Sequence, residues 1–131
     1  MKSIISLLTI VAAILLAGCR TKSSHSDSSG IAKTHVVVTV TCSNPDTKFT
    51  GKIVSDGHSV QLHGTGHATF NASGHQLVCS FKKDASDGQI SISVAEAGKD
   101  LGNARIATKF GGVRADIVRT ALEHHDTFSA F

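Results

Sequence analysis

The sequence predicts an all-β domain, a small antiparallel β-sandwich of seven or eight short strands. Three observations support this prediction. Apolar and polar residues alternate from about residue 34 onward, turn-forming residues recur roughly every 8–12 residues, and no long segment has helical periodicity. Together these features are typical of antiparallel sheets with one buried face.

Composition limits the remaining possibilities. The chain has 131 residues, which is room for one domain. Its 40% hydrophobic and 18% charged residues are ordinary for a globular protein. The net charge of +3 is small, and basic and acidic side chains are interspersed, so we expect no nucleic-acid partner.

The first expected strand lies in residues 34–42 (THVVVTVTC). One of its faces carries Val36, Val38, Val40 and Cys42, and the other carries mostly polar residues. This period of two, together with the many β-branched side chains, favours a half-buried strand. The following Asn44-Pro45-Asp46 is typical of a turn.

The next two strands are predicted to form a hairpin around Asp56-Gly57, a strong two-residue turn signal. In that register Ile53 lies opposite Val60, and Gly51 lies opposite Leu62. Apolar residues thus face each other without adjustment, which supports the predicted pairing.

A second hairpin is predicted around Gly64-Thr65-Gly66, with His63 opposite His67 and both side chains pointing away from the core. Two more strands are expected in residues 75–83 and 89–94. Their inward positions would be Leu77, Cys79 and Phe81 in the first, and Ile90, Ile92 and Val94 in the second.

The last predicted hairpin turns at Gly111-Gly112 and places Ile106 opposite Ile117. A helix from Val113 to about His125 is the alternative, but its apolar residues would spread around the helix, so we favour a strand to Arg119. We expect a β-sandwich domain over residues 33–119 and a tail or short helix over residues 120–131. By architecture alone this domain resembles an immunoglobulin-like sandwich.

The N-terminal segment carries a targeting pattern. One lysine precedes an apolar run of about fourteen residues, which fits a helical signal peptide and is too short to span a bilayer. The run ends in Leu16-Ala17-Gly18-Cys19, which resembles the lipobox of bacterial lipoprotein precursors. The alternatives are an ordinary secretory peptide with a chance cysteine, or a short membrane helix.

The lipobox resemblance implies that residues 1–18 are removed as a signal peptide and that Cys19 is lipidated, which anchors the protein to a membrane. Residues 19–32 would then form the lipidated cysteine and a flexible serine-rich linker. Residue 20 is Arg, not the Asp that resembles an inner-membrane retention signal. In a Gram-negative host we therefore expect the outer membrane, with the domain facing the periplasm.

Two cysteines remain after the anchor, Cys42 and Cys79, both on predicted inward faces. An extracytoplasmic compartment is oxidising, so we predict a disulfide between them. The alternative is a pair of buried free thiols that act as small apolar side chains.

Histidine is enriched, with eight in the chain. Directly opposed on a hairpin, His63 and His67 would be close enough to share a Zn²⁺ or Cu²⁺ ion. The alternative reading is that surface histidines simply occupy polar positions of an exposed sheet face. His58 or His75 is the candidate third ligand, but the alternation places both with the inward-facing set at strand ends, and no carboxylate or thiolate is at a matching position. Metal binding is therefore the secondary interpretation.

No catalytic motif is present: the sequence has no G-x-S-x-G, H-E-x-x-H or phosphate-binding loop. We therefore expect a non-enzymatic protein without a cofactor, an interaction or structural module of the cell envelope with a possible protein partner there. Strand addition at a sheet edge is one binding mode that needs no Trp or Tyr anchor. The alternative function is a metal-binding envelope lipoprotein that uses surface histidines.

Overall fold

The structure is a computed structural model, and it describes residues 31–131. The predicted signal peptide, the lipidated Cys19 and nearly all of the predicted linker lie outside the described residues. The described residues form an all-β domain of two antiparallel sheets packed as a sandwich, which confirms the predicted fold class.

The domain contains nine strands, one or two more than predicted. They are β1 (Thr34–Cys42), β2 (Lys48–Ser55), β3 (His58–Thr65), β4 (His67–Gly74), β5 (Gln76–Lys83), β6 (Ile90–Glu96), β7 (Lys99–Ile106), β8 (Gly112–Arg119) and β9 (His124–Ala130).

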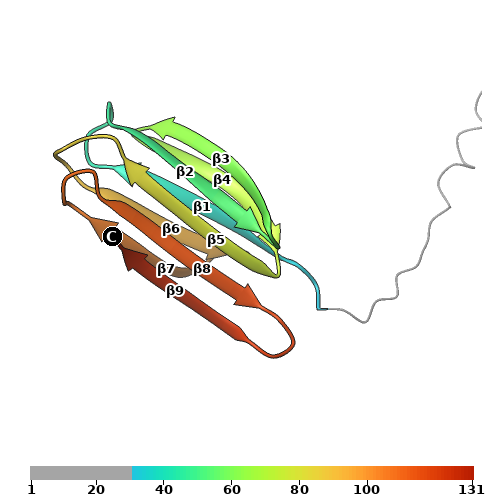
Figure 1. The fold of residues 1–131 in the computed structure, drawn as a ribbon. Helices are drawn as coiled ribbons and strands as arrows, with labels where there is room; N and C mark the ends of the chain where they lie inside the picture. Colours follow the sequence, from blue (N-terminus) through green and yellow to red (C-terminus); the bar gives the residue numbers. More distant parts are fainter. Residues whose placement is uncertain (1–30) are drawn as a thin grey trace, which may run out of the picture. The chain divides into compact units, whose positions relative to one another are not determined.

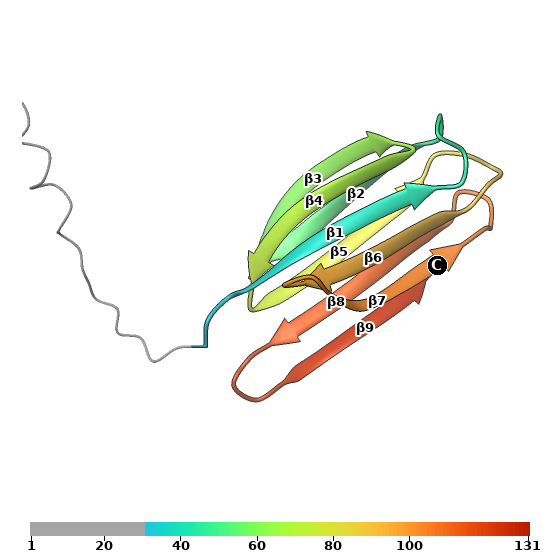
Figure 2. The same cartoon turned by 180° about the vertical axis from the view of Figure 1, so that it is seen from behind.

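One sheet has four strands in the order β4-β1-β6-β7, and the other has five in the order β3-β2-β5-β8-β9. Figure 1 is seen from the side of the five-stranded sheet, and Figure 2 from the side of the four-stranded sheet. Both views place β3 beside β4 at one side of the sandwich and β7 beside β9 at the other.

The core lies between the sheets and consists of the alternating residues that the sequence pattern placed inward. Burial alternates along β1, β5, β6 and most of β8. The buried apolar side chains are Val36, Val38, Val40, Cys42, Phe49, Ile53, Leu77, Cys79, Phe81, Ile90, Ile92, Val94, Val113, Ala115 and Ile117.

The first predicted hairpin is confirmed in its register. In the β2–β3 pair, Ile53 lies opposite Val60 and Gly51 lies opposite Leu62. Asp56 and Gly57 both have positive φ, 48° and 89°, as a tight two-residue turn between twisted strands requires.

The other two predicted hairpins are wrong, because in both places the chain crosses from one sheet to the other. At Gly66 the chain leaves β3 of the five-stranded sheet and enters β4, which pairs with β1. Gly66 has φ 68°, and a Cβ there would lie 2.4 Å from the Pro45 carbonyl oxygen. Near Gly111-Gly112 the chain likewise passes from β7 to β8, so Ile106 pairs with Ile90 and Ile117 with Leu77.

The C-terminal segment also differs from the prediction. Residues 113–119 are a strand, as favoured over a helix, but residues 120–131 contain the further strand β9 instead of a tail or short helix. β9 pairs with β8, and Arg119 makes a two-point ion pair with Asp126, at 2.6 and 3.1 Å. This pairing depends on β8 being in place, so the local pattern of residues 124–130 does not reveal it.

Candidate functional site

The two sides of the sandwich are closed differently. At one side β7 contacts β9, where the Phe128 ring lies so close to Gly102 that a Cβ would be 2.4 Å from it. β3, β4, β7 and β9 are all edge strands of their sheets, but β3 and β4 contact each other only sparsely, unlike β7 and β9. The inward faces of β3 and β4 are only partly covered for this reason.

A cleft of about 700 Å³ opens at this side. Its apolar lining comes from both sheets: Ile53, Val60 and Leu62 from the five-stranded sheet, and Phe70 and Ala72 from the four-stranded sheet. Val60 is at an inward-facing position opposite the buried Ile53, yet 58% of it is exposed. We call this feature the β3–β4 cleft.

Aromatic packing forms one wall of the cleft. The Phe70 ring stacks on Phe81 with centroids 5.5 Å apart, and Phe81 meets Phe49 edge to face at 6.0 Å. Gly51 and Gly64 leave the space that the Phe81 and Phe49 rings fill. Because Phe49 and Phe81 are fully buried, this wall is firmly held and does not depend on a ligand.

One end of the cleft is polar, where the β2–β3 turn meets the connection between β4 and β5. The Asp56 carboxylate accepts backbone N–H bonds from His75 at 2.8 Å and Gln76 at 2.9 Å. The bond from Gln76 contributes most to holding the pKa of Asp56 below its usual value. The Ser55 hydroxyl donates to the Ser73 carbonyl.

Asp, Ser and His side chains also make up many catalytic sites, but here their hydrogen bonds go to backbone atoms and hold neighbouring segments together. His75 lies with Nδ1 3.6 Å from Asp56, and its Nε2 is 2.8 Å from the Ile31 carbonyl oxygen. Ser55 is engaged with Ser73 and makes no hydrogen bond to His75. The arrangement suits binding of an apolar group better than nucleophilic chemistry.

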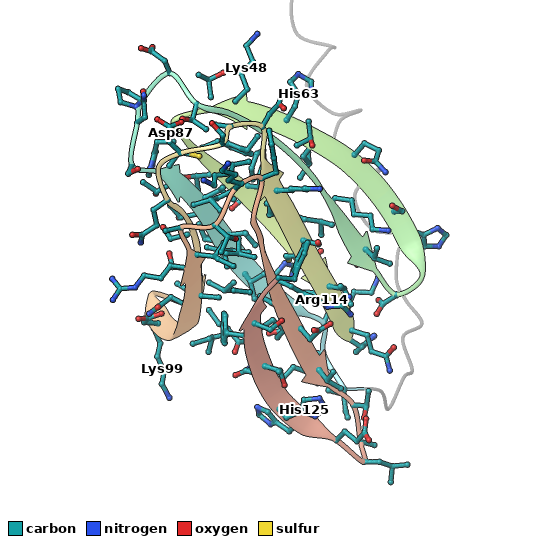
Figure 3. The ribbon with its side chains drawn as sticks, turned by 60° about the vertical axis from the view of Figure 1, so that its left-hand side comes forward. Lys48, His63, Asp87, Lys99, Arg114 and His125 are labelled. Atoms are coloured by element: carbon teal, nitrogen blue, oxygen red, sulfur yellow. The ribbon has the colours of Figure 1, made fainter. Side chains whose placement is uncertain are left out.

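The predicted metal ligands are not brought together. His63 pairs with Thr50 in the five-stranded sheet, whereas His67 pairs with Thr41 in the four-stranded sheet and lies 3.1 Å from its hydroxyl. Both are exposed on the outward faces of their own sheets (His63 is labelled in Figure 3). Residues 31–131 contain no group of three or more His, Cys, Asp or Glu side chains able to hold a metal ion.

The predicted disulfide is absent, and Cys42 and Cys79 are both buried free thiols. Cys42 ends β1 in the four-stranded sheet, where it pairs with Ile90. Cys79 lies in the middle of β5 in the five-stranded sheet, between Ile53 and Ala115. The two thiols therefore belong to different sheets and to different positions along their strands, and no bond joins them.

Neither thiol is poised for nucleophilic chemistry. Burial raises the pKa of Cys79 to about 12, with a smaller contribution from Asp116. Burial also raises the pKa of Cys42, although Lys83 opposes the shift. Both therefore remain protonated near neutral pH and act as small apolar core residues.

The lining residues of the cleft were missed as a site by sequence reasoning. The predicted hairpin register placed Val60 opposite Ile53 and Leu62 opposite Gly51, and they lie there. These residues differ from core residues only because no strand covers them, and that depends on the strand order, which local sequence pattern does not reveal.

Among residues 31–131 there is no helix of the length and apolar character needed to cross a membrane. Comparisons with protein-family models, curated protein sequences and solved structures find no match for this chain.

Proposed function

We propose that this protein is a membrane-anchored lipoprotein of the cell envelope whose β-sandwich is a non-enzymatic binding module, and that the β3–β4 cleft is its binding surface. The lipobox-like Leu16-Ala17-Gly18-Cys19 supports the anchor. The cleft supports the binding role.

The observation that carries the proposal is the exposure of apolar residues at inward positions. Val60 is 58% exposed, and Leu62, Phe70 and Ala72 are partly exposed beside it. The β7–β9 side is closed instead by contact between its two edge strands, with Phe128 packed against Gly102. A concave apolar surface left open, with polar groups at one end, is typical of a ligand or partner site.

Binding is favoured over catalysis because Asp56, Ser55 and His75 are already engaged in hydrogen bonds with backbone groups. The metal-binding alternative loses its main support, since His63 and His67 are on different sheets and are not opposed. We therefore retain the single proposal of an apolar binding surface.

The test uses Nile red, a neutral dye whose emission shifts to shorter wavelength in apolar surroundings. We expect residues 20–131 to bind it, and Val60→Lys to weaken binding about tenfold or more, because a charged group would enter the cleft. Val37→Lys is the matched control: Val37 is 41% exposed, but on the outward face of β1.

The control variant should bind the dye like the unchanged protein. Equal affinity in all three proteins, or equal loss in both variants, would show that the cleft is not the binding surface. Far-ultraviolet circular dichroism of each variant checks that the sandwich is intact.

A further inference from the structure

The edges that border the β3–β4 cleft have an unusual composition. β3 (HSVQLHGT) and β4 (HATFNASG) are eight residues long, and neither contains Lys, Arg, Asp, Glu or Pro. Natural sheets usually protect free edges with charged residues, proline or bulges, because an unprotected edge pairs with other strands. These two edges carry none of these devices.

The edge strands on the opposite side of the sandwich, β7 and β9, do contain charged residues. β7 contains Lys99, Asp100 and Arg105, and β9 contains Asp126. The β6–β7 ladder also has an irregularity between Val94 and Ala95. The domain thus protects its closed side and leaves the open side free to pair.

Unpaired backbone groups indicate what kind of occupant the cleft accepts. Along the free flank of β3, every second residue directs its N–H and C=O away from β2. A hydrocarbon chain or lipid covers apolar side chains but offers those groups no hydrogen-bond partner, so they remain bonded only to water. A β-strand satisfies the backbone and covers the side chains together.

We propose that the β3–β4 cleft receives an extended, uncharged segment of a partner polypeptide, which adds as a strand to the free edge of β3. This inference rests on the proposed binding role of the cleft. The edge of β3 is favoured because Val60 is the most exposed inward-facing apolar residue of the cleft, and a neighbouring strand would cover it.

The cleft also defines the chemistry of that segment. Its inward side chains would meet Leu62 on one sheet and Phe70 and Ala72 on the other, so alternate residues must be apolar. An eight-residue strand spans roughly 26 Å, and a charge placed beside Leu62, Phe70 and Ala72 would be buried against apolar side chains. The charged groups of the lining, Lys33 and Asp56, lie near each other at the polar end of the cleft. The expected partner therefore presents a flexible, neutral stretch with apolar residues at every second position.

The test compares three labelled synthetic peptides of about ten residues. The first alternates Val and Thr, with neutral capped ends. The second has the same composition, with the Val residues gathered at one end. The third repeats the first sequence with every backbone nitrogen methylated, which removes all N–H donors without removing apolar surface. Binding to residues 20–131 is measured by fluorescence anisotropy.

We expect the alternating peptide to bind, and both other peptides to bind at least about tenfold more weakly, since several backbone hydrogen bonds and the side-chain register are lost. Val60→Lys should abolish binding, whereas Val37→Lys should not change it. Hydrogen exchange should show new protection of β3 amides in the complex.

Three outcomes would overturn the inference. Equal binding of the alternating and methylated peptides means that the cleft takes apolar groups without strand pairing. Nile red binding without any peptide binding leaves the proposed function standing and removes the strand partner. Concentration-dependent dimerisation that Val60→Lys prevents, measured by sedimentation without peptide, assigns the edge to a second copy of this chain.

Discussion

Two glycines at inward positions determine how the aromatic wall of the cleft packs. Gly51 lies on β2 between its neighbours β3 and β5. A Cβ built on it would lie 2.3 Å from the Phe81 ring and 2.4 Å from the Ser80 carbonyl oxygen. Gly64 has the same relation to Phe49, at 2.5 Å. The two rings thus occupy the space that a side chain at Gly51 or Gly64 would need.

Gly51→Ala should destabilise the domain by about 1–3 kcal/mol, because an added methyl group in a close-packed core forces the Phe81 ring and the backbone of β5 to shift. The free energy of unfolding in urea measures the effect. Lys52→Ala, at the exposed neighbouring position, should change it by no more than about 0.5 kcal/mol. A loss for Gly51→Ala no larger than for this control would contradict the packing described.

At the scale of elements, the Asp56 carboxylate joins two connections that are distant in the sequence. It lies in the β2–β3 turn and accepts hydrogen bonds from the backbone where β4 passes to β5. These N–H donors bond better to the carboxylate than to the carboxylic acid. They therefore lower the pKa of Asp56 in the folded state relative to the unfolded state.

A lowered folded-state pKa means that the ionised carboxylate stabilises the domain above the unfolded-state pKa, near 3.8. This stability is lost as the pH falls from that value through the lower folded-state pKa. Asp56→Asn should reduce stability at neutral pH and flatten its decline below about pH 4. Urea unfolding measured at a series of pH values tests this.

The matched control is Asp84→Asn, since Asp84 is exposed. The control should retain the acid-dependent decline of the unchanged protein. If Asp56→Asn declines with the same slope as the control, the carboxylate does not link the two connections as described.

At the scale of the whole molecule, the proposed function depends on attachment at Cys19, which lies outside the described residues. Cys19→Ser should prevent lipidation, because a hydroxyl is a far weaker nucleophile than a thiol and forms no thioether with the lipid. Intact-mass spectrometry of both proteins measures the lipid. An unchanged protein that retains residues 1–18 and carries no lipid would contradict the lipoprotein proposal.

Much of the fold could be predicted from local pattern. The alternation in β1, β5 and β6 predicted which side chains are buried, since period-two apolar residues mark one face of a strand wherever that strand lies. The Asp56-Gly57 turn predicted the β2–β3 register, because a two-residue loop leaves only one way to pair its flanking strands. β9 escaped prediction, since HHDTFSA contains few apolar residues and is held mainly by pairing and by Arg119.

Local sequence pattern was enough to predict an all-β sandwich, the residues that face its core and one hairpin register. Four features depend on the three-dimensional arrangement: the sheet that each strand joins, the crossings at Gly66 and Gly111, the free thiols Cys42 and Cys79, and the open cleft between β3 and β4. Side-chain alternation can be predicted because it is a property of a few consecutive residues. Strand order cannot be predicted in this way, because it is set by pairings between segments that are distant in the sequence.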